Sequence, residues 1–305
     1  MRSRCCALLS LRSNLGTRRT VNGALDEGTK RAMQTHRQLV EHFEIERELA
    51  DKLKSSTKET RRTLYKDLYD ELFRRVPHHP QLTEKASAEA RRLSAARQVK
   101  FLLSIATSRP VFLEVGAGDC LTSLEMAKSA SQVYAVDVSS EITAKINAPD
   151  NFQLLLSDGS SIDVEAQSVD LAFSNQLMEH LHPDDALEQL RNIHRALKRN
   201  GEYFCITPNR FSGPHDVSQH FAEVACGFHL REYCLGELLL LFKSAGFSKF
   251  HIFVGKDGLY IRVPLALCRA VELMVGALPR RVRKRVGKWA PVRLLLGIRL
   301  LAVKA

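Results

Sequence analysis

The stretch Val111–Cys120, which reads VFLEVGAGDC, decides how the chain folds. An apolar run reaches Glu114 and Val115 and then breaks into a turn in which glycine alternates with another residue. A short apolar run that ends in a glycine-rich turn before an amphipathic segment is typical of a buried strand followed by a helix. We therefore predict that residues 111–115 form the first strand of a parallel sheet. The turn after this strand would lie at the ligand-binding edge of the sheet.

The residues after the turn alternate between short apolar runs and amphipathic segments, which is the pattern of βαβ units. The expected strands cover residues 111–115, 133–138, 152–156, 169–174, 202–207, about 249–254 and the last residues of the chain. The expected helices cover residues 121–130, 140–146, 184–198 and 235–245. Asn200-Gly201 would cap the third of these helices. The predicted fold class is α/β: a Rossmann-like, seven-stranded, mostly parallel sheet with helices on both faces.

Two helical parts are expected in addition to the sheet. The stretch from about residue 35 to 108 contains no glycine, and residues such as Tyr65, Leu68 and Leu72 recur at helical steps. We predict a disordered or targeting tail at 1–25, a helical N-terminal extension at 26–95 and the sheet domain at 96–255. A basic insertion of two helices at 256–296 and the last strand at 297–305 would complete the chain.

Composition limits the classes of function. The chain has 305 residues and a net charge of +11, but its two ends carry the positive charge: residues 260–305 hold eleven basic side chains and one acid, Glu272. This distribution does not indicate a general nucleic-acid groove. The seven cysteines include no CxxC pair, so they suggest neither a zinc site nor a disulfide framework. No apolar run is long enough for a membrane span, and we expect a cytoplasmic protein, with the peripheral membrane contact considered below.

The glycine turn differs from that of a dinucleotide-binding fold. In the pattern GxGxxG the sixth position would be glycine, but here it is Leu121, and the charge of Glu114 would oppose a pyrophosphate. An acid at this place suits a ligand with a cationic amino group. Asp137 follows about twenty residues after the glycines, where an acid can bind both hydroxyls of a ribose, a spacing that also fits NAD. The pattern Glu-x-Gly-x-Gly resembles the first motif of class I S-adenosylmethionine-dependent methyltransferases.

The resemblance extends over residues 111–246 and implies the methyl donor S-adenosyl-L-methionine. The segment SNQLMEH, residues 174–180, is similar to the methyltransferase subgroup that includes ubiquinone-pathway O-methyltransferases. Some of those enzymes bind a metal with an acid three residues before the Glu-His pair. That position is Gln176 here, and we expect no metal. The resemblance implies that the donor is bound by Glu114, Gly116, Ala117, Gly118, Asp137, Val138, Asp158, Gly159, Asn175 and Gln176. The matching acid in the family binds the adenine amino group, a role that would fall to Asp158; the residue could equally be a turn aspartate.

Proton removal from an acceptor would need a base, and histidine has a suitable pKa. We predict His180 and His215 as catalytic residues, each on a segment that leaves the ligand edge. Either could instead be an ordinary hydrogen-bonded loop residue. The predicted function is methyl transfer to a small-molecule or lipid-like acceptor at oxygen. The alternatives are an RNA or protein methyltransferase, a non-catalytic binding or scaffold protein with this fold, and, disfavoured by Leu121, an NAD oxidoreductase.

The basic insertion contains the sequence RRVRKRVGKWAP at residues 280–291. Its basic residues recur at helical steps beside an apolar stripe that ends in the only tryptophan. Such a helix can lie on an anionic membrane surface. We predict a contact with anionic membranes through Arg281, Lys284, Arg285, Lys288 and Trp289. The alternative is a helical cap whose charges are solvated or paired.

Overall fold

The computed structural model describes residues 27–79, 88–138 and 148–305. The chain divides into two compact units, residues 1–41 and residues 42–305. Helix α1 (Glu27–Ser55) begins in the first unit and ends in the second. The tail expected at 1–25 and the helix expected at 140–146 lie outside the described residues. Everything below concerns the second unit.

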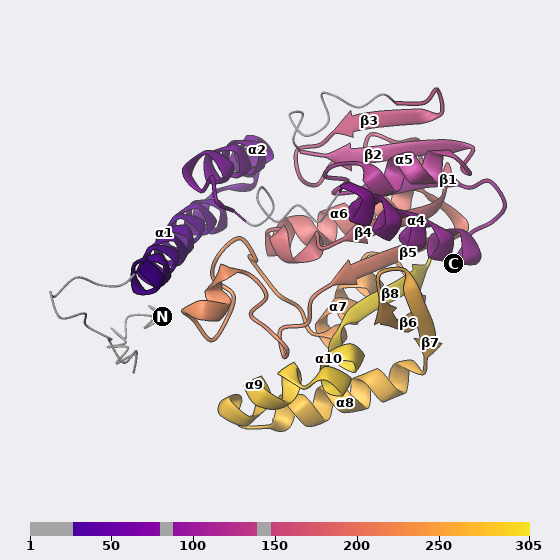
Figure 1. The fold of residues 1–305 in the computed structure, drawn as a ribbon. Coiled ribbons are helices and arrows are strands. Elements are labelled where there is room, and N and C mark those ends of the chain that lie inside the picture. The colour runs from indigo at the N-terminus through magenta and orange to yellow at the C-terminus, as the bar shows by residue number, and fades with distance from the viewer. Residues whose placement is uncertain (1–26, 80–87, 139–147) are drawn as a thin grey trace, which may run out of the picture. The chain divides into compact units, whose positions relative to one another are not determined.

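The centre of this unit is one mixed sheet of eight strands (Figure 1). The strand order is β3-β2-β1-β4-β5-β8-β6-β7, and neighbours from β3 to β5 pair in parallel whereas β8, β6 and β7 add antiparallel pairs. The bounds are β1 Val111–Val115, β2 Gln132–Asp137, β3 Phe152–Leu156, β4 Val169–Asn175, β5 Leu197–Thr207, β6 Lys249–Lys256, β7 Leu259–Val263 and β8 Ile298–Val303. From β1 the strand order runs to β2 and β3 on one side and to β4 and β5 on the other, so the topological switch point lies between β1 and β4. Ligands bind at such a switch point, beyond the carboxyl ends of the strands.

The α/β fold class is confirmed, but the sheet has eight strands instead of seven. The additional strand is β7, which forms a hairpin with β6. The turn between them contains Asp257 and Gly258, both with positive φ. Asp-Gly is a strong hairpin signal, and it was present in the sequence within the segment that we expected to be helical.

Helices cover both faces of the sheet. On one face α4 (Ala88–Ile105) and α5 (Leu121–Ala127) pack against residues such as Phe112, Phe173 and Phe204. On the other face α6 (Pro183–Ala196) and α7 (Leu235–Ser244) pack against Leu113 and Tyr203. The alternation of inward-facing residues along β1 follows from the period of two in a strand. Figure 1 shows the arrangement.

The N-terminal extension has a small core of its own. Helix α2 (Lys58–Arg75) buries Tyr65, Leu68 and Leu72 on one face, as their helical spacing predicts. These side chains pack with Leu49 of α1 and with Phe228, which lies in the long connection between β5 and α7. The extension is therefore packed on a loop that leaves the ligand edge of the sheet.

Two sequence-based boundaries are wrong. Helix α6 ends at Ala196, and residue 197 already begins β5, so Asn200-Gly201 is not a helix cap. Asn200 has a positive φ of 61° and its backbone N–H donates to Lys304 next to the paired strand β8. The insertion holds three helices instead of two: α8 Leu265–Ala277, α9 Arg280–Lys288 and α10 Ala290–Leu296. The breaks lie beside Pro279 and Pro291, since proline cannot continue a helix.

None of the helices in the described ranges is long and apolar enough to cross a membrane.

Candidate active site

The turn after β1 is fastened to the end of β2. Gly116 and Gly118 have φ values of 75° and 51°, which favour glycine. The backbone N–H groups of Gly116 and Ala117 both donate to the carbonyl of Val136, at 2.8 and 3.1 Å. A Cβ on Gly116 would approach Leu177 Cδ1 to 3.0 Å. The turn therefore needs a bare backbone at this point, as its glycine spacing predicts.

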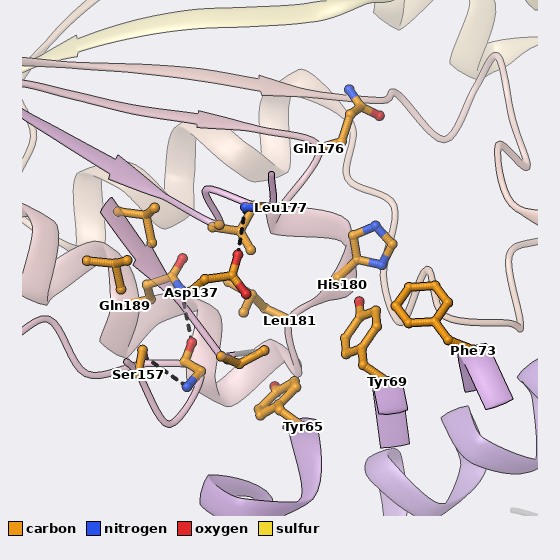
Figure 2. Close-up of a pocket in the computed structure, with 16 residues that line it drawn as sticks. Tyr65, Tyr69, Phe73, Asp137, Ser157, Gln176, Leu177, His180, Leu181 and Gln189 are labelled. Atoms are coloured by element: carbon orange, nitrogen blue, oxygen red, sulfur yellow. Dashed lines mark hydrogen bonds between the residues drawn. The ribbon is translucent and has the colours of Figure 1, made fainter. Parts of the chain in front are cut away.

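A cavity opens beside this turn, at the carboxyl ends of the parallel strands (Figure 2). We call it the sheet-edge cavity. Most of its wall comes from the segments that follow β1, β2, β3 and β4, and the rest comes from α2 and α6. The residues that line it are Tyr65, Tyr69, Phe73, Val115, Gly116, Gly118, Val136, Asp137, Val138, Ser157, Gly159, Gln176, Leu177, His180, Leu181 and Gln189. Apart from Asp137, none of the described residues in this wall has an acidic or permanently charged side chain.

Asp137 is the acid of this wall. It ends β2, and its Oδ2 accepts a hydrogen bond of 2.8 Å from the backbone N–H of Gly118. This contact holds the carboxylate beside the glycine turn, as Figure 2 shows. Asp137 therefore lies in the cavity wall, and its role toward a ligand stays a prediction.

Glu114 does not line the cavity. Its side chain is buried in the strand, and one carboxyl oxygen accepts a hydrogen bond from the hydroxyl of Ser123 in α5. Burial raises the pKa of Glu114 to about 8. The carboxyl group of Glu114 therefore links β1 to α5 through Ser123. It lies in the interior of the protein and does not form part of the cavity wall.

Three other residues that the resemblance implied for donor binding lie outside the lining. Asp158 accepts from the backbone N–H groups of Ser160 and Ser161 at 3.1 and 2.7 Å, which makes it a turn aspartate. Asn175 faces a separate hollow that also contains Asp119. Ala117 is buried in a small apolar cluster. The sheet-edge cavity thus contains Gly116, Gly118, Asp137, Val138, Gly159 and Gln176 of the ten predicted residues.

The two predicted catalytic histidines are separated. His180 lines the sheet-edge cavity, and its Nδ1 lies 3.0 Å from the carbonyl of Phe228, so Nδ1 carries the proton and Nε2 the lone pair. Burial lowers the pKa of His180 to about 3. His215 is not part of the lining; its backbone N–H donates to Glu232 at 2.7 Å and its ring lies 3.2 Å from the hydroxyl of Ser212.

His229 is a residue that the sequence analysis missed. Its ring lies 4.8 Å from that of His180, and its Nδ1 is 2.8 Å from Glu232 Oε1. Burial opposes protonation of His229, but the hydrogen bond with Glu232 and the negative charges of Glu179, Glu232 and Asp216 together outweigh it, and the pKa is raised. His215 is therefore linked to the cavity wall indirectly: it contacts Glu232, Glu232 contacts His229, and His229 contacts His180. The only signal in the sequence was a histidine in the connection after β5.

Two groups of side chains in the described part of the chain have the ligands of a metal site. One is His42, Glu46 and His79, and the other is Glu179, His180 and His229. In the second group Glu179 Oε1 is buried without a hydrogen-bond partner among the described residues, and burial raises the pKa of Glu179 to about 7. Two imidazoles and a carboxylate fit a divalent transition metal. A cation held there would polarise an oxygen in the cavity, and His180 would then no longer be free to accept a proton.

Aromatic side chains of α2 were also missed as parts of the site. Tyr65, Tyr69 and Phe73 close one side of the cavity, and the ring of Tyr69 lies 6.2 Å from that of His180 (Figure 2). Their helical spacing predicted a buried face, but nothing in the sequence indicated that this face meets the sheet edge. The N-terminal extension is therefore part of the site.

A buried ion pair fixes α2 in this place. The guanidinium of Arg61 donates to both carboxyl oxygens of Asp185 in α6, at 2.7 and 2.9 Å. The hydroxyl of Tyr65 donates to the same carboxylate at 2.9 Å and accepts from the backbone N–H of His182 at 2.8 Å. Both charged side chains are about 95 % buried, with 4 % and 5 % exposed. The aromatic wall thus depends on one charge pair.

Comparisons with known proteins agree with this geometry. Residues 113–205 match the family model described as a methyltransferase domain. The phosphoethanolamine N-methyltransferase 1 of Haemonchus contortus has a similar structure, with a TM-score of 0.53 and 17% identity; the match covers 82% of this chain and 50% of that one. The 1,6-didemethyltoxoflavin-N1-methyltransferase of Burkholderia thailandensis matches with a TM-score of 0.48 and 18% identity over 82% of this chain and 91% of its own.

A search of curated proteins finds no match to the sequence. The family match includes most of β1, the glycine turn and β4, which are among the elements that build the sheet-edge cavity. Residues 113–205 therefore match a methyltransferase domain in sequence, and the fold is that of solved S-adenosylmethionine-dependent methyltransferases. The prediction made from Glu-x-Gly-x-Gly is confirmed at this level.

Proposed function

We propose that the sheet-edge cavity binds S-adenosylmethionine and that the protein transfers its methyl group to an oxygen of a small-molecule or lipid-like acceptor. The observation that carries this proposal is the meeting of three features in one cavity: the glycine turn, Asp137 and the neutral imidazole of His180. Each comes from a different segment at the carboxyl edge of the sheet.

The residues present fit the methyl donor. The bare backbone of Gly116 and Gly118 allows close approach, and Asp137 would accept hydrogen bonds from the ribose hydroxyls. Gln189 offers a further contact that the sequence did not indicate. Its Nε2 donates to the carbonyl of Gly159 at 2.9 Å, but its Oε1 is buried without a partner among the described residues. We assign to Gln189 Oε1 the adenine amino group that we had expected Asp158 to bind.

The protein's contribution to the transfer is alignment and exclusion of water. Bound S-adenosylmethionine supplies a methyl group that its sulfonium already makes electrophilic. Leu177, Leu181 and the α2 aromatics give the cavity an apolar wall, which would hold the acceptor and keep water out. Such a wall suits an acceptor with apolar or aromatic surface.

His180 gives the reason to favour oxygen as the methylated atom. With Nδ1 held by the Phe228 carbonyl, Nε2 can accept a proton from a hydroxyl in the cavity. Because its pKa is about 3, the imidazole is neutral near pH 7. An imidazole with so low a pKa is a weak base. It can accept the proton of a hydroxyl only as the methyl group is transferred, because the acceptor oxygen then becomes positively charged and its proton much more acidic.

The proposal includes a contact with anionic membrane through α9. Trp289, at the end of this helix, is 65 % exposed, and Val282 is 45 % exposed. Arg285 and Lys288 are also exposed, so basic and apolar side chains occupy neighbouring turns. A helix of this kind can lie at a lipid surface, which supports delivery of a lipid-like acceptor.

Calorimetry with S-adenosylhomocysteine tests the core of the proposal. Wild-type protein should bind it, and binding should weaken in Asp137→Ala and in Gln189→Leu. Release of S-adenosylhomocysteine from S-adenosylmethionine, followed across a panel of phenols, amines and hydroxylated lipids, would then identify the acceptor. A protein that binds neither nucleotide would overturn the assignment and leave a scaffold with a methyltransferase fold.

A further inference from the structure

A second cavity lies between α9 and the connection that follows β5, and its volume is about 450 Å³. We call it the basic cavity. It is lined by Arg210, Phe211, Gly213, Pro214, Glu223, Val224, Ala225, Arg231, Glu232, Arg280, Arg281, Arg283 and Lys284. It shares no lining residue with the sheet-edge cavity.

The charge of this lining is strongly unbalanced. Six of its side chains are cationic and two, Glu223 and Glu232, are acidic. Glu232 is already engaged with the backbone N–H of His215 and the ring of His229. Glu223 is exposed and lies 3.5 Å from Arg280. Among the described lining residues, the other cations therefore have no matching acid.

Some of these cations are paired outside the cavity and others are not. Arg210 and Arg231 share one carboxylate, Glu237, at 2.8 and 3.6 Å. For Arg281 and Lys284 there is no ion pair within the described residues. Several like charges held around one hollow repel one another, and an anion between them would relieve that repulsion.

Packing places the guanidinium groups before any ligand arrives. Phe211 lies between Arg210 and Arg283, whose Cζ atoms are 5.1 and 5.3 Å from the ring centre. The Nε of Arg283 is buried and has no hydrogen-bond partner in the described chain. A Cβ on Gly287 would lie 2.1 Å from the carbonyl oxygen of Phe211, so α9 packs closely on this loop. The arrangement is preorganised, which lowers the entropy cost of binding.

The start of α9 adds to the positive potential. The helix begins at Arg280 after Pro279, and no side chain caps it. Free backbone N–H groups and the helix dipole favour an anion at such an end. Arg280 and Arg281, its first two residues, both line the basic cavity.

We propose that the basic cavity binds a ligand that carries a phosphate monoester or a diphosphate. Guanidinium groups match phosphate oxygens by paired hydrogen bonds, and the cavity has room for more than one phosphate. The ligand could be a soluble phosphate ester or the head group of a lipid. Of the four basic residues predicted for the membrane contact, Arg281 and Lys284 line the cavity, whereas Arg285 and Lys288 do not.

That division supplies a matched pair of variants. Inorganic pyrophosphate is the probe, and its binding is followed by calorimetry and by the fluorescence of Trp289, the only tryptophan. Arg281→Gln/Lys284→Gln should weaken binding by about tenfold or more, because charge-assisted hydrogen bonds are lost. Arg285→Gln/Lys288→Gln removes the same charge from the same helix and should change affinity by less than about threefold. Failure of wild-type protein to bind pyrophosphate, or equal losses in both variants, would overturn the proposal.

Vesicles identify the source of the phosphate. If a lipid is the ligand, wild-type protein sediments with vesicles that contain phosphatidic acid, and pyrophosphate releases it. If a soluble ester is the ligand, pyrophosphate binds but vesicles do not compete with it. Either result supports the proposal. Because Arg285, Lys288 and Trp289 can bind vesicles from outside the cavity, the comparison is made with Arg281→Gln/Lys284→Gln: if that variant sediments as wild-type protein does and also binds pyrophosphate as wild-type protein does, the proposal is overturned. The inference does not depend on methyl transfer, so binding of S-adenosylhomocysteine by both variants shows that they are folded and separates the two proposals.

Discussion

The sheet-edge cavity and the basic cavity are lined by different kinds of residues. The sheet-edge cavity is made largely of backbone and apolar side chains, and its Asp137 and His180 are half-buried. The basic cavity is made of long cationic side chains on an added helix and a loop. The first is a product of the sheet topology that this chain shares with solved methyltransferases. The second is formed where α9, in the insertion between β6 and β8, meets the connection after β5.

The difference has consequences for how each cavity responds to change. A cavity whose positions are set by strands tolerates few substitutions, because each residue also holds the fold. One that depends on exposed charges is sensitive to charge and salt but contributes little to stability. Variants should therefore affect one cavity and leave the other intact.

The largest expected effect is the loss of the aromatic wall. Asp185→Ala would leave Arg61 buried without its main partner, and we expect the free energy of unfolding to fall by about 3–5 kcal/mol. The aromatic residues of α2 would then move from the sheet-edge cavity. Urea denaturation would measure the fall, and pyrophosphate binding at low urea should persist in the basic cavity.

The control for this change is an exposed pair on the same two helices. Lys58 Nζ lies 2.5 Å from Glu188 Oε2, and the two side chains are 48 % and 31 % exposed. Glu188→Ala should lower the free energy of unfolding by less than about 1 kcal/mol. Equal losses in Asp185→Ala and Glu188→Ala would show that the buried pair does not hold α2.

The second effect concerns the methyl donor. Asp137→Ala removes an acceptor that faces the cavity, and the loss of charged hydrogen bonds should weaken binding of S-adenosylhomocysteine about 100-fold. Asp158→Ala is the matched control, since its carboxylate is held by Ser160 and Ser161 outside the lining. We expect less than about fivefold weakening for it. Calorimetry would measure both, and a larger effect at Asp158 would restore the adenine role expected from the sequence.

Local signals in the sequence predicted the parallel half of the sheet and the place of the donor. Glycine spacing, the apolar run of β1 and the position of Asp137 depend on neighbours in the chain, so they could be read directly. The residues that they contact in the folded protein could not be read from the sequence. Asp185 meets Arg61 and His229 meets His180 across long separations, and no pattern encodes such contacts. Glu114 had the right residue type at the right place, but its burial and its bond to Ser123 depend on how α5 packs.

Glu114 and His180 should contribute opposite dependences of stability on pH. The folded-state pKa of Glu114, about 8, lies above its value in the unfolded chain, so the contribution of Glu114 to stability is largest at low pH and falls as the pH rises toward 8. Replacing it in Glu114→Gln should flatten this dependence by about 2–3 kcal/mol between pH 5 and 7. Thermal unfolding across that range would measure the change. Parallel curves for wild type and variant would mean that Glu114 ionises normally.

His180 should give the smaller change, with the reverse sign. Its folded-state pKa of about 3 lies below the unfolded value, so its contribution to stability is present above pH 6.5 and is lost as the pH falls. Relative to His180→Gln, wild-type protein should lose up to about 2 kcal/mol between pH 7 and 5. The imidazole signal of His180 in NMR spectra should not titrate between pH 8 and 5. A titration with a midpoint near 6.5 would show that the ring is solvated, and the aromatic wall would then not exclude water from the site of transfer.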